Sequence, residues 1–282
     1  MIENRASRTA ERVALRRAAH QLLDHPLVLD DPIALAMVGA DAAAALRADP
    51  QQFERGPYAI PLRAFLAVRS RVAEDTLAST VARGVRQYVV LGAGFDTFAF
   101  RNPFPDLRVI EVDHPATQAA KRERLAAAGI ALPQSFIFAA TDFSTRSLSD
   151  VLQAAGLRAE EPAFFSWLGV TPYLDEATVM ATLAGIAPFA SSGGGVVFDY
   201  SAPRASLSPR QQVAFDALAA RVAAAGEPFK SSFEPETLMS AVRALGFASV
   251  HDLTAADLNA TFFAHRRDDL RVGGTGHILV AL

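Results

Sequence analysis

Apolar and polar residues alternate along the chain with two different periods, and the change comes at about residue 86. Before that point the apolar positions recur at helical spacing, and a long helix is expected over about 61–82. Asp31 and Pro32 resemble a helix cap followed by a first-turn proline, whereas about 40–60 is expected to be irregular. The sequence therefore predicts a helical N-terminal extension over residues 1–85. The repeat is clearest in the first helix, at Leu15, Ala18, Ala19, Leu22 and Leu23.

From residue 86 onward, short apolar runs typical of buried strands alternate with helical patterns. The expected strands cover 87–91, 107–113, 135–139, 163–168, 195–199, 248–253 and 277–282. The expected helices cover about 116–128, 149–155, 175–189 and 235–245, with a further helix in an insertion at about 203–231. This order predicts an α/β domain over 86–282 with a mainly parallel, doubly wound sheet.

Two of the expected strands end in residues that fit a nucleoside cofactor. The first ends in Gly92-Ala93-Gly94, where glycines let the backbone approach a ligand closely. The second ends in Glu111-Val112-Asp113, and Asp113 follows Gly92 by 21 residues. An acid at the tip of the neighbouring strand can accept hydrogen bonds from two ribose hydroxyls. The alternative is a simple turn between a strand and a helix.

The residues that follow Gly94 in the turn distinguish a dinucleotide cofactor from S-adenosylmethionine. A dinucleotide fingerprint requires a third glycine where this chain has Thr97, and Asp96 precedes it. S-adenosylmethionine has no phosphate, and its ammonium and sulfonium groups are compatible with a nearby acid. The turn therefore favours S-adenosylmethionine over NAD. Asp96 either positions the cofactor's amino group or caps the following helix.

Composition excludes several classes of function. The 282 residues carry a net charge of −3, so no overall basic field points to nucleic acid or to an anionic membrane. The absence of cysteine excludes disulfides, thiol nucleophiles and zinc–thiolate sites, and the six histidines show no metal-like spacing. The first residues are polar and of mixed charge, unlike a signal peptide, so a cytoplasmic protein is expected.

The residues of the glycine turn and its surroundings resemble the leucine carboxyl methyltransferase family, in particular its bacterial O-methyltransferase branch. The resemblance covers about residues 5–200. It rests on Asp30-Asp31-Pro32, Arg69, Leu91-Gly92-Ala93-Gly94-Phe95-Asp96-Thr97, Glu111-Val112-Asp113-His114-Pro115, Lys121, Ala140-Thr141-Asp142-Phe143 and Tyr173-Leu174.

This resemblance implies a Rossmann-like class I methyltransferase sheet with an antiparallel last strand. It also implies cofactor contacts: Gly92, in the turn with Gly94, lies against the methionine part, and Asp113 holds the ribose. Asp142 and Phe143 contact the adenine. The chain departs from the family at Leu168-Gly169, where an acid often stands in place of Leu168, so a contact made by that acid is missing or has moved.

Arg69 falls on the apolar stripe of the long helix, where a charged group needs a partner. The resemblance supplies the cofactor's carboxylate as that partner. The alternative is a buried ion pair, or a side chain that extends to the edge of the core. Lys121 and Arg101 are expected in structural ion pairs. The stripe consists of Leu62, Phe65, Leu66, Val72 and Ala73.

The acceptor side of the site is expected at the carboxyl ends of the last parallel strands, where open α/β sheets bind ligands. Tyr173, Tyr200 and Asp199 are the candidates there. The function predicted is S-adenosylmethionine-dependent O-methylation of a carboxylate or hydroxyl, on a small molecule or a peptide terminus. An NAD-dependent oxidoreductase and a non-catalytic cofactor-binding or scaffold protein are the alternatives. A general base and the oligomeric state are left open.

Overall fold

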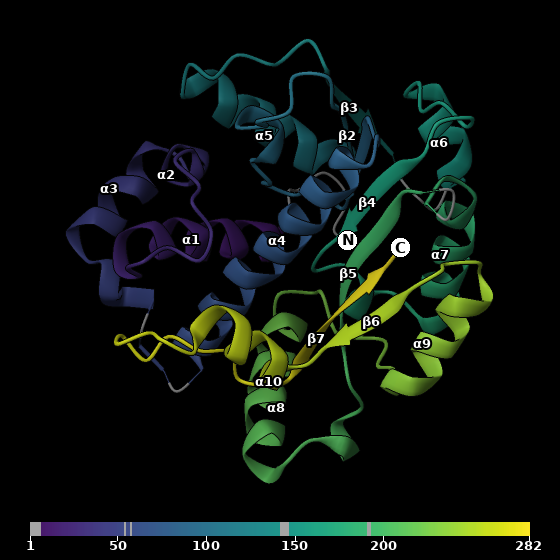
Figure 1. Ribbon diagram of the computed structural model, residues 1–282. Helices are drawn as coiled ribbons and strands as arrows, with labels where there is room; N and C mark the ends of the chain where they lie inside the picture. Colours follow the sequence, from purple (N-terminus) through teal and green to yellow (C-terminus); the bar gives the residue numbers. More distant parts are fainter. Residues whose placement is uncertain (1–6, 54, 57, 142–146, 191–192) are drawn as a thin grey trace.

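A single seven-stranded sheet forms the centre of the computed structural model, which describes residues 7–53, 55–56, 58–141, 147–190 and 193–282 (Figure 1). Its strand order is β3-β2-β1-β4-β5-β7-β6. The strands are β1 (Gln87–Leu91), β2 (Arg108–Asp113), β3 (Phe136–Ala140), β4 (Ala163–Trp167), β5 (Gly195–Ser201), β6 (Val250–Leu253) and β7 (Gly276–Ala281).

The pairing of the strands has the pattern that the sequence predicts. β1 lies between β2 and β4 and is parallel to both, and β4 is parallel to β5. β7 runs antiparallel to β5 on one side and to β6 on the other. The mainly parallel sheet with an antiparallel last strand is therefore confirmed. Its carboxyl-end edge brings together the ends of β1, β2, β4 and β5.

Helices cover both faces of the sheet. On one face, α6 (Leu148–Ala154), α7 (Glu176–Ala190) and α9 (Pro235–Ala244) pack in one apolar cluster with strand residues such as Val89 and Phe165. The opposite face carries α4 (Ala59–Ala82) together with the short α10 (Ala255–Leu258). α5 (Pro115–Ala127) packs near β3 at the far edge, against the N-terminal helices. Thus α4, although part of the expected extension, forms part of the sheet's own core.

The N-terminal helices differ from the prediction at two places. α1 (Arg8–Leu23), α2 (Ala34–Met37) and α3 (Ala40–Ala48) form a small apolar cluster with α5. The expectation of irregular structure over 40–60 is wrong for α3, whose run of alanines has high helix propensity. Asp31 is not a helix cap, because its carboxylate is buried in ion pairs instead.

Further short elements complete the chain after and between the strands. α8 (Pro209–Ala223) follows β5 inside the expected insertion and lies at the bottom of Figure 1. The π-helical turn η5 (Asn259–Phe263), like α10, was not predicted from the sequence. The single-turn helices are η1 (Pro50–Phe53), η2 (Phe98–Phe100), η3 (Thr171–Tyr173) and η4 (Arg204–Ser206). In the described part of the chain, none of the helices has the length and apolar character needed to span a membrane.

Candidate functional site

The turn after β1 requires glycine at two positions. Gly92 and Gly94 have φ angles of +64° and +52°, in the left-handed region that other residues avoid. A Cβ atom on Gly92 would lie 2.4 Å from Cγ2 of Val170, which cannot be accommodated without movement. A Cβ atom on Gly94 would lie 3.2 Å from the Cβ of Ala10 on α1. The turn is thus packed between α1 and the loop after β4.

Asp113 ends β2 beside this turn, and the backbone fixes its carboxylate. One oxygen accepts the N–H of Gly94, and the other accepts the N–H of His114 at 2.6 Å. Burial raises the pKa of Asp113 above its usual range despite these hydrogen bonds. Each oxygen keeps a second lone pair, and the residue remains partly exposed. The carboxylate can therefore still accept hydrogen bonds from a diol such as ribose.

Glu111, two residues earlier, is turned into the protein. Its carboxylate is 1% exposed and pairs with Lys121. Burial raises the pKa of Glu111 to about 7, against the opposing effect of Lys121. Since Glu111 is buried with a partner of its own, it is not in position to take the ribose contact in place of Asp113. The expectation that Lys121 forms a structural ion pair is confirmed.

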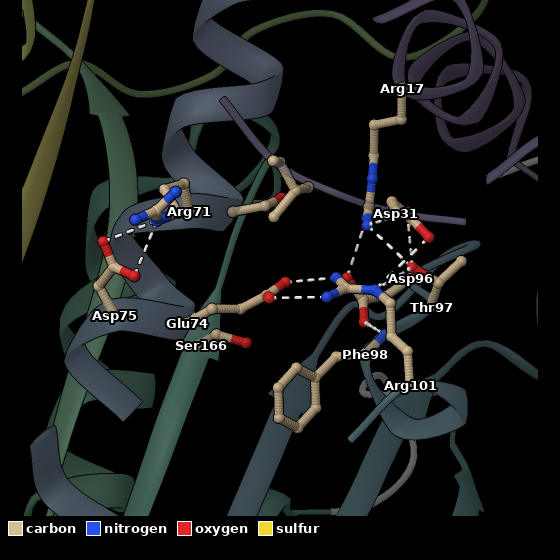
Figure 2. A network of polar contacts seen from close by, with 12 residues as sticks. Arg17, Asp31, Arg71, Glu74, Asp75, Asp96, Thr97, Phe98, Arg101 and Ser166 are labelled. Carbon is tan, nitrogen blue, oxygen red and sulfur yellow. Dashed lines mark hydrogen bonds and ion pairs between the residues drawn. The ribbon is translucent and has the colours of Figure 1, made fainter. Parts of the chain in front are cut away.

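Asp96 and Thr97 belong to a buried polar network that joins the turn to α1 (Figure 2). One oxygen of Asp96 accepts from Arg17 at 3.0 Å, and the other accepts from the N–H of Phe98 at 2.8 Å. Arg17 also donates to Asp31 at 2.8 Å and to Thr97 at 3.0 Å. Both oxygens of Asp96 thus have protein partners. The bond from the N–H of Phe98 is the one that the helix-cap alternative predicts, whereas the ion pair with Arg17 was not predicted from the sequence.

The same network continues to α4. Arg101 donates to both carboxylate oxygens of Glu74, which confirms the expected structural ion pair of Arg101. Burial acts to lower the pKa of Arg17, but Asp31 and Asp96 raise that pKa overall. Burial acts to raise the pKa of Asp96, but the neighbouring cations, Arg17 first, lower it overall. These shifts describe a network in which the charged forms stabilise one another.

Thr97 also bears on the dinucleotide alternative. It stands where a dinucleotide fingerprint has its third glycine, and it is 1% exposed with its hydroxyl bonded to Asp31 at 2.7 Å. The element that follows, η2, has three residues instead of a full α-helix. A helix N-terminus of the kind that binds pyrophosphate is therefore not formed by the described residues of this turn.

Arg69 reaches from α4 to the carboxyl end of β5. It is 8% exposed, and its Nη1 donates to Asp199 at 2.8 Å. The other oxygen of Asp199 accepts the N–H of Gly169 at 2.5 Å. A Cβ atom on Gly169, whose φ is +73°, would lie 2.8 Å from Nη2 of Arg69. Arg69 thus forms the buried ion pair that was the alternative to a cofactor contact. This pair places its guanidinium against Gly169, the residue that follows Leu168.

A cavity of about 530 Å³ opens beside Arg69, Asp199 and Gly169. Its walls come from α1, α4, α8, the end of β5 and the loops that precede α7 and β7. Both tyrosines nominated for the acceptor side border it. A volume of this size is typical of sites for small organic molecules.

The two tyrosines differ in what their hydroxyls contact. Tyr200 donates to Asp252 at 2.9 Å, on the face of the sheet that α9 covers, and is 1% exposed. Tyr173 packs on Phe229 with ring centroids 5.4 Å apart, and burial raises its pKa to about 12. Tyr173 therefore remains the stronger candidate for the acceptor side. Asp142 and Phe143, nominated for the adenine, lie outside the described residues.

The contribution of α1 to the site was missed in the sequence. Arg17 contacts the glycine turn, and Arg12 and Arg16 line the cavity. A signal was present for Arg17, since it follows Ala14 by three residues and precedes Ala18, both on the apolar face of α1. A charged residue beside such a stripe needs a buried partner, but nothing in the sequence says that the partners are Asp31 and Asp96.

Comparison with known proteins gives consistent matches. The family model described as leucine carboxyl methyltransferase matches residues 10–187. A relative from Bacillus subtilis, named "Putative S-adenosyl-L-methionine-dependent methyltransferase YktD", is 30% identical over 303 residues, covering all of this chain and 99% of the relative.

Two solved structures share the fold at lower identity. One is a DUF574 family protein from Streptomyces avermitilis, with a TM-score of 0.54 and 16% identity, covering 100% of this chain and 99% of the other. The second is a "putative methyltransferase" from Thermobifida fusca, with a TM-score of 0.54 and 16% identity over 99% and 96% of the two chains. Since the family model matches well over half of the chain, and the Bacillus relative matches nearly end to end, the chain belongs to the leucine carboxyl methyltransferase family of S-adenosyl-L-methionine-dependent methyltransferases.

Proposed function

We propose that this protein is an O-methyltransferase whose acceptor is a carboxylate on a small molecule or on a peptide terminus. The cavity beside Arg69 and Asp199 would hold the acceptor, because it lies where the carboxyl ends of the parallel strands meet. The family supports methylation of a carboxyl group through its description. A hydroxyl acceptor is the alternative.

The cofactor's contacts are proposed from the residues that fit them. Asp113 would hold the ribose, since its carboxylate is oriented by two backbone N–H groups and can accept further hydrogen bonds. Gly92 and Gly94 would lie against the methionine part, and Arg69 would pair with its carboxylate through the guanidinium nitrogen not bonded to Asp199. When bound, S-adenosylmethionine supplies an electrophilic methyl group to a nucleophilic oxygen.

One observation favours a carboxylate over a hydroxyl: the described residues that line the cavity include no histidine, glutamate or lysine. Their single carboxylate, Asp199, already accepts hydrogen bonds from Arg69 and Gly169. Tyr173, with a pKa of about 12, is neutral at pH 7 and can donate a hydrogen bond but is a poor base. A carboxylate oxygen can be methylated without losing a proton, whereas a hydroxyl has to lose one.

The test compares acids and alcohols that share one skeleton. Purified protein would be incubated with methyl-tritiated S-adenosylmethionine and either 3-phenylpropanoate or 3-phenylpropanol, and the products treated with mild hydroxide. We expect label in the acid product that hydroxide releases as methanol, because methyl esters hydrolyse and ethers do not. The rate should change little between pH 6 and 8, since the acid is ionised throughout.

Two results would contradict the proposal. Label in a hydroxide-stable ether, with a rate that rises with pH, would establish a hydroxyl acceptor. Binding of S-adenosylhomocysteine with no transfer to any acid, over a panel of aromatic and peptide carboxylates, would favour the non-catalytic alternative.

A further inference from the structure

The cavity is lined by an excess of positive charge. Asp199 is the single carboxylate among its described lining residues, although the chain as a whole has a net charge of −3. The excess is therefore local to the cavity and does not follow from composition. The cationic lining residues are Arg12, Arg16, Arg69, Arg210, Arg221 and Arg271.

Arg69 and Arg271 have carboxylate partners among the described residues. Arg69 pairs with Asp199 at 2.8 Å, and Arg271 pairs with Asp269 at 2.8 Å. Within the described ranges, no carboxylate forms an ion pair with Arg12 or Arg221. The cavity therefore holds cations whose charge the described part of the protein does not neutralise.

Arg12, Arg16 and Arg221 form a cluster that we call the arginine cluster. Arg12 and Arg16 stand four residues apart on α1, so they share one face of that helix. Nη1 of Arg16 donates to the backbone oxygen of Arg12 at 3.3 Å. Nη1 of Arg12 is buried and makes no hydrogen bond to any described residue. Arg221 reaches the same cavity from α8.

Like charges in this cluster repel one another. The pKa of Arg16 is lowered to about 10, first by burial and then by Arg221 and Arg12. Glu227 lies nearby but is occupied: it accepts from the hydroxyl of Ser7 at 2.8 Å and from the N–H of Thr9 at 3.2 Å. These bonds tie the start of α1 to the segment that follows α8. Such a cluster of like charges costs stability unless an anion is bound.

We propose that the arginine cluster is a subsite for an anionic group of the acceptor, a carboxylate, sulfonate or phosphate other than the group that is methylated. Arginine suits this role because its planar donors match carboxylate and phosphate oxygens. The inference rests on the proposed function, since it takes the cavity as the acceptor's site.

The apolar part of the cavity indicates what the rest of the acceptor molecule is like. Leu62, Phe65, Phe215, Leu218 and Phe229 supply apolar and aromatic surface between α4 and α8. The volume of about 530 Å³ accommodates a molecule of two or three rings. The acceptor class is therefore an apolar or aromatic acid that carries a second anionic group.

The test uses two fluorescent probes with the same rings. 8-Anilinonaphthalene-1-sulfonate carries a sulfonate, and N-phenyl-1-naphthylamine lacks it. We expect the wild-type protein to bind the sulfonate at least tenfold more tightly. Arg12→Gln and Arg221→Gln should each weaken sulfonate binding by about tenfold or more, the scale of one charge-assisted hydrogen bond. Both variants should leave binding of the neutral probe within about twofold.

A matched control is Arg47→Gln on α3, which removes an exposed arginine outside the cavity and should change neither affinity. Ligand-free melting temperature is measured for every variant. It should hold or rise for Arg12→Gln and Arg221→Gln, because each removes a repulsion. Equal binding of the two probes, equal weakening of both, or a fall in melting temperature alongside the lost affinity would overturn the subsite.

Titration with S-adenosylhomocysteine separates this inference from the proposed function. Both cavity variants should bind it as the wild type does, because the arginine cluster is not among the proposed cofactor contacts. Failure of the wild type to bind S-adenosylhomocysteine would overturn the proposed function, whereas loss of the sulfonate preference with cofactor binding intact would overturn the subsite alone.

Discussion

Replacing Arg17 by methionine should destabilise the protein more than most single substitutions. Arg17 is buried, and its guanidinium contacts Asp31 at 2.8 Å and Asp96 at 3.0 Å. Methionine keeps the apolar stem of the side chain, so the change removes the charge and its hydrogen bonds with little loss of packing. Two neighbouring carboxylates then lose their main cation.

The size of the effect follows from burial. The side chain of Arg17 is 8% exposed and that of Asp31 is fully buried. Removing one partner of a buried ion pair costs about 3–5 kcal/mol, because an uncompensated charge is left behind. Arg101, 3.4 Å from Asp31, still compensates part of that charge and keeps the cost toward the lower end. A loss of about 3 kcal/mol corresponds to a fall of about 5 °C in melting temperature for a chain of this size.

The assay is urea unfolding of wild type, Arg17→Met and a control, Arg71→Met. Figure 2 shows the ion pair of Arg71 with Asp75. Their closest N–O distance is 2.8 Å, but the two side chains are 44% and 51% exposed. Exposed pairs contribute about 0–1 kcal/mol, and the hydrogen bond from Arg71 to the backbone oxygen of Val28 contributes about 0.5–1.5 kcal/mol, so the control should lose clearly less stability than Arg17→Met. If Arg17→Met costs no more than Arg71→Met, the buried network does not stabilise the fold as argued.

The pH dependence gives a second check on Arg17→Met. In the wild type the pKa of Asp96 is lowered, so its contribution to stability is present above its usual range and lost as the pH falls through the folded value. Without Arg17 the folded pKa of Asp96 rises, and protonation of Asp96 at low pH removes part of the uncompensated negative charge. The difference in stability between the two proteins should therefore shrink from pH 7 to pH 4. A constant difference would contradict this explanation.

Three further predictions concern the site. Asp113→Ala should weaken binding of S-adenosylhomocysteine by about 1.5–3 kcal/mol in calorimetry, and unchanged affinity would refute its ribose role. Arg69→Met should weaken the same ligand about tenfold or more but leave an analogue without the carboxylate unaffected, whereas an equal effect on both would restrict Arg69 to its pair with Asp199. Because the folded pKa of Glu111 is raised to about 7, the wild type should lose stability as the pH rises from 4.5 to 7. The double variant Glu111→Gln with Lys121→Met should reduce this pH dependence of the melting temperature. An unchanged pH dependence would show that Glu111 is not its source.

The centre of the sheet could be predicted from the sequence because β1, β4 and β5 are buried on both faces. The runs before Gly92 and Asp113 consist mostly of β-branched, aromatic and aliphatic residues, and the structure places strands there within one or two residues. Such runs are a local signal that does not depend on their neighbours. The short helix α3 was not predicted because Pro50 and Gly56, which follow it, are typical of irregular structure, whereas its alanines favour a helix.

The polar partners could not be predicted in the same way. The residues around Asp31 predict a helix cap, yet its carboxylate pairs with Arg17. Arg17 also contacts Asp96, which is 79 residues away in the sequence. The partner of a buried charge is decided by which helices pack together, and that depends on the whole fold. The contribution of α1 and α8 to the cavity could not be predicted for the same reason, since these two helices lie far apart in the sequence.

The two faces of α1 have a consequence for how the chain can vary. Ala10 and Arg17 lie against the glycine turn, whereas Arg12 and Arg16, at about 200–240° around the helix from Ala10, line the cavity. One added residue between Val13 and Ala14 would rotate everything after it by about 100° relative to everything before it. Neither face could then keep its full set of contacts. The phase of this one helix therefore fixes two surfaces at once, and length variation is expected to concentrate in the loops that flank it.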